Sequence, residues 1–144
     1  MIVAAASPTA QSQSQGGDLG MPVGRVLVVD DQPQVAVMFR EVLTNLGYEG
    51  EIALSGPDAL RLVPTFRPDV VLLDLSMPGM SGAEVFAYLR GAHPDLPVII
   101  VTGNADMALA RDTLAPGAFD YIQKPFNIEI LARTVAAALR QREG

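Results

Sequence analysis

Five short stretches of the chain have the composition of β-strands, and each is followed by a segment with helical spacing. They cover residues 25–30, 48–54, 69–75, 98–103 and 119–123. The first, third and fourth stretches, "RVLVVD", "DVVLLDL" and "VIIVTG", are apolar almost throughout, whereas the second, "YEGEIAL", is the weakest. Continuous apolar runs are typical of strands covered on both faces, so the pattern predicts a parallel sheet.

The first two helical segments are bounded by proline and glycine. Pro33 suits the first turn of a helix, because an N–H group at that position has no partner within the helix, and Gly47 is a natural stop. We predict a shorter second helix over 57–63, closed by the proline-containing stretch 64–68. The apolar positions expected on the first helix are Val35, Met38, Phe39, Val42, Leu43 and Leu46.

The three later helical segments carry their own start signals. Ser81 and Glu84 form a capping-box pattern at the start of a helix predicted over 81–90. The next segment, 107–114, is predicted as one further helix. Asn127 is well placed to cap the last helix. The apolar positions expected on one face of that helix are Ile128, Leu131, Val135 and Leu139.

Five strands that alternate with five helices predict a doubly wound α/β domain, with right-handed crossovers and helices on both faces of one parallel sheet. The chain has 144 residues, 49% of them hydrophobic, which suits a single domain with one full core. Residues 1–22 are rich in Ser, Gln and Gly, and we interpret them as a disordered leader. The domain is therefore expected over 23–144.

Composition and charge exclude several classes of function. The formal net charge of −6 argues against direct contact with nucleic acid, whose phosphates recruit clustered Lys and Arg. The chain has no cysteine, which removes disulfides, thiolate nucleophiles and soft metal sites and fits a reducing compartment. No apolar stretch approaches the ~20 residues that span a bilayer, so no membrane segment is expected. His93 precedes a proline and is interpreted as a loop residue.

Polar side chains gather where the predicted strands end. Asp30 and Asp31 end the first strand, Asp74 the third and Thr102 the fourth, while Lys124 follows the fifth. In doubly wound sheets, ligands bind outside the carboxyl ends of the strands. Each residue taken alone could be a turn or surface residue, but five of them at one sheet edge favour a functional site.

The three carboxylates of this edge need a cation. At ~4 Å each pair would repel by roughly 4 kcal/mol at an effective dielectric constant near 20. Mg²⁺ is the natural candidate, because it prefers oxygen ligands and keeps waters that a phosphate oxygen can displace. Lys124 offers a second positive charge, suited to a phosphoryl group.

The motifs at the strand ends resemble the receiver domain of two-component response regulators. The resemblance covers Arg25 to Arg142 and includes "VVDD", "DVVLLDLSMPGMSG", "VIIVTG" and "GAFDYIQKPF" in the family's order and with similar spacing. It implies a flavodoxin-like sheet with strand order 2-1-3-4-5. It also implies a cytoplasmic signalling module that catalyses only its own phosphorylation and dephosphorylation.

Carried over to this sequence, the resemblance makes Asp74 the phospho-acceptor. The phosphoryl group would come from a phosphohistidine on a histidine kinase or phosphotransfer protein. Asp31 and Asp74 would bind Mg²⁺ directly with the backbone carbonyl of Ser76, while Asp30 would act mainly through a bound water.

The resemblance also implies a switch. Thr102 and Lys124 would hold the phosphoryl oxygens, and Thr102 would move toward them. Tyr121 would then move from exposed to buried, and the face made by the fourth helix, fifth strand and fifth helix would change shape. That face is the one through which a homodimer would form. A fixed, half-buried Tyr121 stays open as an alternative, and the bond between Lys124 and Pro125 is expected to be cis.

Two further groups of residues follow from the resemblance. Ser76 and Asn104 occupy positions where receivers vary and where side chains influence the access of the hydrolysing water. Kinase docking in the family uses the first helix and the loop after the fifth strand. The corresponding residues here are Gln34, Val35, Met38, Pro125 and Phe126. For Val35 and Met38, a place in the core is at least as good an interpretation.

Three other functions compete with this interpretation. A receiver-like scaffold could signal without phosphorylation, although all five polar residues at the strand ends are present. Aspartate-nucleophile phosphohydrolases have two aspartates separated by one residue after the first strand, whereas Asp30 and Asp31 are adjacent. A dinucleotide- or flavin-binding module is disfavoured because no GxGxxG follows the first strand.

Overall fold

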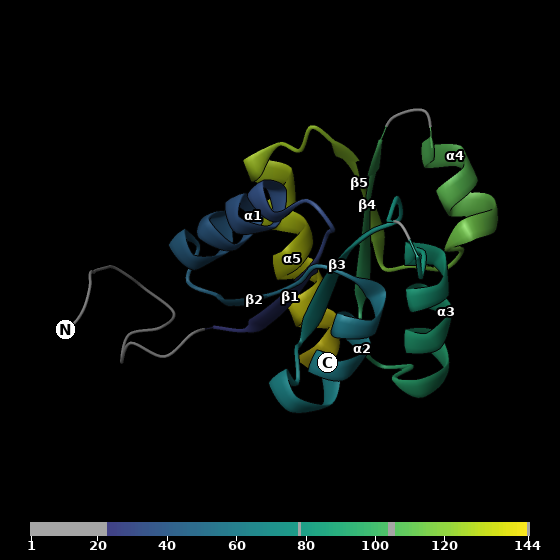
Figure 1. The fold of residues 1–144 in the computed structure, drawn as a ribbon. Coiled ribbons are helices and arrows are strands. Elements are labelled where there is room, and N and C mark those ends of the chain that lie inside the picture. The colour runs from purple at the N-terminus through teal and green to yellow at the C-terminus, as the bar shows by residue number, and fades with distance from the viewer. Residues whose placement is uncertain (1–22, 78, 104–105, 144) are drawn as a thin grey trace.

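The computed structural model describes residues 23–77, 79–103 and 106–143, so the predicted leader and Asn104 lie outside the described residues. Within them the chain forms one five-stranded parallel sheet in the order β2-β1-β3-β4-β5 (Figure 1). The strands are β1 (Arg25–Val29), β2 (Glu49–Ala53), β3 (Val70–Asp74), β4 (Val98–Gly103) and β5 (Asp120–Lys124). The helical elements are α1 (Pro33–Asn45), α2 (Gly56–Phe66), α3 (Gly82–Ala92), α4 (Met107–Leu109), η2 (Ala110–Leu114) and α5 (Ile128–Glu143). The predicted doubly wound α/β fold is confirmed.

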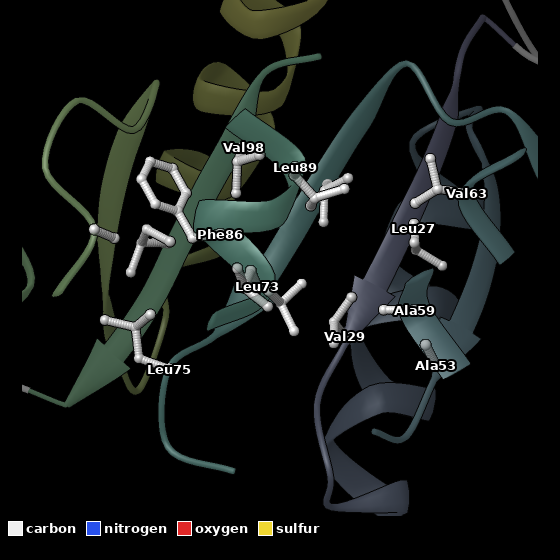
Figure 2. Packing of buried hydrophobic residues seen from close by; sticks show 14 of the residues in the cluster. Leu27, Val29, Ala53, Ala59, Val63, Leu73, Leu75, Phe86, Leu89 and Val98 are labelled. Carbon is white, nitrogen blue, oxygen red and sulfur yellow. The ribbon is translucent and has the colours of Figure 1, made fainter. Parts of the chain in front are cut away.

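Helices cover both faces of the sheet. Alternate residues of β1 point to opposite faces: Leu27 and Val29 belong to the core beneath α2 and α3, whereas Val26 and Val28 belong to the core beneath α1 and α5. Figure 2 shows the first of these cores, with Leu27 and Val29 directed toward Ala59 of α2. Because both faces are buried, the central strands are apolar almost throughout, as the sequence pattern predicts.

The helix-start signals are confirmed. The Ser81 hydroxyl accepts the N–H of Glu84 at 3.2 Å, and the Glu84 carboxylate accepts the N–H of Ser81 at 2.9 Å. The side chain of Asn127 accepts two N–H groups from the first turn of α5. Gly47 follows α1 with a positive φ of 98°, a conformation that favours glycine.

The prediction that the second helix closes before Pro64 is wrong, because α2 continues through this proline to Phe66. Pro64 has no N–H to donate within the helix, but it lies in the last turn, so most of the hydrogen bonds of α2 are unaffected. The N–H of Arg67 donates to the carbonyl oxygen of Val63 at 2.9 Å at the end of this helix, and tertiary contacts add to this bond. Arg25 donates from Nε to the carbonyl oxygen of Phe66 at 2.7 Å, and its guanidinium lies 4.5 Å from the centre of the buried Phe66 ring.

The segment 107–114 is not the single α-helix that its sequence predicts. A short α-helical turn, α4, is followed by the π-helical segment η2. The N–H of Ala115 donates to the carbonyl oxygen of Ala110 at 2.9 Å, which closes the wide turn. Ala110 is fully buried against the α2–α3 core, so a tertiary contact accompanies the change in helix type.

Two predicted helix faces are also corrected. Ile128, predicted on the buried face of α5, is 55% exposed, while Leu131 and Val135 are fully buried. Side chains of a helix lean toward its N-terminus, and Ile128 is the first residue of α5, so its side chain extends past the end of the helix. Met38 on α1 and Leu46, which directly follows that helix, are exposed. Fewer of the large apolar residues are buried on these two helices than the sequence pattern predicts, and small residues take part in the buried faces instead. Those small residues are Ala36 on α1 and Ala138 on α5.

We expect Gly82→Ala to lower the free energy of unfolding by about 1–3 kcal/mol, the usual cost of overpacking. A Cβ atom at this buried position would overlap the backbone carbonyl oxygen of Asp74. Urea denaturation measures the change. Gly91→Ala in the same helix is the control, because a methyl group added there would meet nothing within 4 Å and alanine favours the helix by about 0.5–1 kcal/mol. Equal effects of the two substitutions would contradict this account of the packing.

Candidate functional site

The polar residues predicted from the strand ends lie at one edge of the sheet. Asp30 follows β1, Asp74 is the last residue of β3, Thr102 lies near the end of β4 and Lys124 is the last residue of β5. All five strands are parallel, so these ends share the carboxyl edge. Strand order places β1 beside β3 and β3 beside β4, which brings residues distant in sequence together.

Three carboxylates form the centre of this edge. Asp30, Asp31 and Asp74 each offer an oxygen atom, and these atoms all lie within 4.8 Å of one another. Asp30 is 2% exposed and Asp74 is 5% exposed, while Asp31 is partly exposed. The ammonium of Lys124 lies between the two buried carboxylates, 3.2 Å from Asp30 Oδ2 and 3.4 Å from Asp74 Oδ2. The structure therefore brings these four predicted residues together.

The two buried carboxylates are held in the same way. The N–H of Gln32 donates to Asp30 Oδ1 at 2.9 Å, and the N–H of Ser76 donates to Asp74 Oδ1 at 3.0 Å. In each aspartate the second oxygen faces Lys124. Each carboxylate is thus fixed by the backbone two residues further along, a local turn that aspartate favours. The sequence analysis missed the backbone of Gln32, which this turn pattern could have indicated.

The positive charge near the buried Asp74 carboxylate does not fully compensate for its loss of solvent. Burial raises the pKa of Asp74 above its usual range, and the nearby Asp30 raises it further. The Ser76 N–H and the Lys124 ammonium lower it, but the net shift is upward. Lys124 brings one positive charge to a site with three carboxylates. A donor set of carboxylate oxygens with excess negative charge fits a hard divalent cation such as Mg²⁺.

Thr102 adds an unpaired hydroxyl to this edge. It is 1% exposed, and its Oγ1 has no hydrogen-bond partner among the residues that the structure describes. Leaving a buried hydroxyl unpaired costs about 1–3 kcal/mol. A buried polar atom of this kind fits a group that the chain itself does not supply.

Tyr121 lies apart from the carboxylates. Its ring is half-buried, and its hydroxyl donates to the carbonyl oxygen of Ala115 at 2.6 Å and accepts the N–H of Ala118 at 3.2 Å. The guanidinium of Arg111 lies 5.5 Å from the ring centre. The side chain therefore joins β5 to the loop that follows η2. The Lys124–Pro125 bond is cis, as the resemblance implies.

Comparisons with known proteins agree with this geometry. The family model described as "Response regulator receiver domain" matches residues 26–136, so the chain belongs to the response regulator receiver family. The response regulator MprA of Mycolicibacterium vanbaalenii is 41% identical over 121 residues, which cover 84% of this chain and 52% of that protein. The DNA-binding response regulator MtrA of Mycolicibacterium smegmatis is 41% identical over 119 residues, 83% of this chain and 52% of that protein.

Solved structures show the same fold. A response regulator receiver domain protein from Clostridium thermocellum aligns with a TM-score of 0.79 and 28% identity, covering 84% of this chain and 98% of that one. The receiver domain of NtrX from Brucella abortus aligns with a TM-score of 0.75 and 29% identity, covering 80% of this chain and 98% of that one. The chain spans about half the length of the curated relatives it matches. It is a receiver domain of two-component response regulators, a class of phosphoacceptor signalling modules.

Among the described residues, no helix has the length and apolar character needed to cross a membrane.

We expect Asp74→Asn to be more stable than the wild type at pH 7. A raised pKa means that the folded state favours the protonated carboxyl, so stability is lost as the pH rises through the folded pKa. The neutral amide avoids this loss, and its advantage should vanish below about pH 4, where the carboxyl is protonated in both states. Urea denaturation at several pH values measures the difference.

Asp69→Asn is the matched control for this prediction. Asp69 precedes the same strand at its opposite end, and its Oδ2 accepts the N–H of Arg25 at 2.9 Å, a bond that an amide oxygen can also accept. No gain in stability is expected there. A destabilised Asp74→Asn at pH 7 would show that pairing with Lys124 outweighs burial.

Proposed function

We propose that Asp74 accepts a phosphoryl group from a phosphohistidine of a histidine kinase or phosphotransfer protein in a Mg²⁺-dependent reaction. One observation supports this most: a buried Asp74 carboxylate has one oxygen facing the Lys124 ammonium and lies within 4.8 Å of two further carboxylates. An oxygen of Asp74 would form the new bond to phosphorus while the phosphorus–nitrogen bond breaks. The electron pair of that bond returns to the imidazole.

The chain's own residues supply alignment and charge. Phosphoryl transfer through a loose transition state depends mainly on positioning and on neutralising the transferred oxygens. The Ser76 N–H fixes Asp74 Oδ1, which leaves Oδ2 on the side of Lys124. Lys124 would then exchange part of its pairing with Asp74 for a phosphoryl oxygen. The unpaired hydroxyl of Thr102 would donate to another phosphoryl oxygen.

The carboxylate cluster suits Mg²⁺. Asp31, Asp74 and the backbone carbonyl of Ser76 would bind the ion directly, and Asp30 would act mainly through a bound water. The ion would supply positive charge that the transferred oxygens and the carboxylates share. Hard oxygen donors and the uncompensated charge at Asp74 support this assignment.

Phosphorylation would shift a population between two packings. A phosphoryl group can do this only by binding one packing better. Reorientation of Thr102 would break no hydrogen bond of its hydroxyl to the described residues. Tyr121 would have to break two hydrogen bonds to leave its present position. We propose that these two residues connect Asp74 to the face formed by α4, β5 and α5.

The wider role follows the family. As a signalling module, the domain would catalyse only its own phosphorylation and dephosphorylation, and it would form homodimers through the α4-β5-α5 face. The relative MtrA is named as a DNA-binding response regulator. Because the net charge of this chain is −6, any DNA contact would be made by a part of the protein outside this domain. A domain boundary at residue 23 and a cytoplasmic location stay predictions.

Incubation with acetyl phosphate and Mg²⁺ should add the mass of one phosphoryl group to the wild-type chain, as read by intact-mass spectrometry. Asp74→Asn should add none, and chelation of divalent ions should abolish the gain. Asp69→Asn, at the other end of β3, should be phosphorylated like the wild type. An undiminished gain in Asp74→Asn would contradict the proposal, and no gain in the wild type would favour a scaffold that signals without phosphorylation.

Tyr121→Phe should loosen the loop between η2 and β5, because the N–H of Ala118 and the carbonyl of Ala115 both lose their bond to the hydroxyl. Hydrogen exchange over residues 110–120 should become faster. Tyr88→Phe on α3 is the control, because Tyr88 is 52% exposed. Unchanged exchange in Tyr121→Phe would show that the hydroxyl does not hold this loop.

A further inference from the structure

We propose that Phe126 is a positioning residue that holds Lys124 between Asp30 and Asp74. The inference rests on the proposed function, since it assigns a cause to the placement of the lysine used there. It concerns the stacked pair formed by Phe126 and Phe39, whose ring centres lie 4.5 Å apart with an interplanar angle of 21°.

Lys124 needs a constraint beyond its own strand. It ends β5 at the edge of the sheet, whereas Asp30 follows β1, and β3 and β4 lie between those strands. Neighbouring strands are about 4.8 Å apart, so the lysine must lean across the sheet edge to reach Asp30 at 3.2 Å. Its side chain is 28% exposed and therefore only partly confined by packing. A free lysine side chain has about 2 kcal/mol of rotamer entropy to lose.

The stacked pair supplies this constraint. Phe126 stands two residues after Lys124, in the connection that returns from β5 toward α1 and α5 over the carboxyl edge (Figure 1). Its ring packs against the α1–α5 core, where Phe39 of α1 is 2% exposed. The helix that carries Phe39 begins at Pro33, just after the acidic pair. The stack therefore fixes the backbone that follows Lys124 to the element that follows Asp30 and Asp31.

Two simpler roles for Phe126 make different predictions. A residue used only for kinase docking would leave phosphorylation by a small donor unchanged, because such a donor brings no kinase surface to dock. A residue that serves only the core would affect phosphorylation no more than any other phenylalanine of the same cluster. A positioning residue changes the rate even with a small donor, since slight misplacement of a charged group can slow a reaction by up to about 10²-fold.

Phe119 is a matched control. Like Phe126, it is partly buried and packs against the α1–α5 core, but it lies just before β5 rather than just after it. Its backbone N–H donates to the carbonyl oxygen of Val98, at the opposite edge of the sheet from the carboxylates. Truncating either ring removes an apolar contact with the same core, but only Phe126 lies within two residues of Lys124.

The experiment measures the rate of phosphorylation of the full chain by acetyl phosphate with Mg²⁺, using intact mass. Phe126→Ala should be roughly 10-fold slower than the wild type, Phe119→Ala should stay within about 2-fold, and Phe126→Tyr, which keeps the ring, should restore the rate. Urea denaturation establishes that each variant is folded. Should Phe126→Ala fail to fold, Phe126→Leu against Phe119→Leu gives the same comparison.

Coupling to Lys124 completes the test. In a Lys124→Ala background, Phe126→Ala should cause no further slowing, because residues that act as a unit are not additive. Equal slowing by Phe126→Ala and Phe119→Ala, or the same slowing in both backgrounds, would overturn this inference and leave the proposed function intact. A Lys124→Ala variant as fast as the wild type would instead overturn the proposed role of Lys124, and this inference with it.

Discussion

The ammonium of Lys124, placed between the carboxylates of Asp30 and Asp74, is the interaction on which the site depends. Buried charges are costly unless they are paired and hydrogen-bonded. Here each carboxylate has one oxygen on a backbone N–H and the other on the lysine, so both conditions are met for the two residues. Burial, and to a lesser extent the nearby Asp30, still raises the pKa of Asp74, and the net negative charge of the three carboxylates favours a further cation.

The fold serves this interaction by geometry. A parallel sheet places the carboxyl ends of all its strands at one edge, and apolar helices on both faces leave that edge as the place where polar side chains can gather. The aspartates come from the adjacent strands β1 and β3, whereas the lysine comes from the edge strand β5. The long side chain of lysine suits the outermost strand, since it must pass the end of β4 to reach Asp74 and the ends of β4 and β3 to reach Asp30.

Sequence reasoning reached the site because a strand end is a local feature. Once the apolar runs predict parallel strands, the positions of Asp30, Asp74 and Lys124 follow from the topology without knowledge of any contact. The two incorrect helix predictions, in contrast, concern segments where tertiary contacts accompany the observed structure. The continuation of α2 past Pro64 is accompanied by a contact with Arg25, which is distant in sequence, and the π-helical segment η2 by the burial of Ala110. Local propensity cannot show contacts of this kind.

The side chains that hold the site together differ from those through which we propose that it responds to phosphorylation. The carboxylates of Asp30 and Asp74 each pair with Lys124 and accept a backbone N–H, whereas the hydroxyl of Thr102 is buried without a partner among the described residues. A folded chain tolerates such an atom at a cost of about 1–3 kcal/mol, and a bound oxyanion would recover that cost. Tyr121 is in the opposite state, with its hydroxyl fully engaged. In the switch that we propose, the unpaired hydroxyl of Thr102 would favour the packing that brings it to a phosphoryl oxygen, whereas the hydrogen bonds of Tyr121 would favour the present one. Such a difference in preference is what a phosphoryl group needs to shift the population.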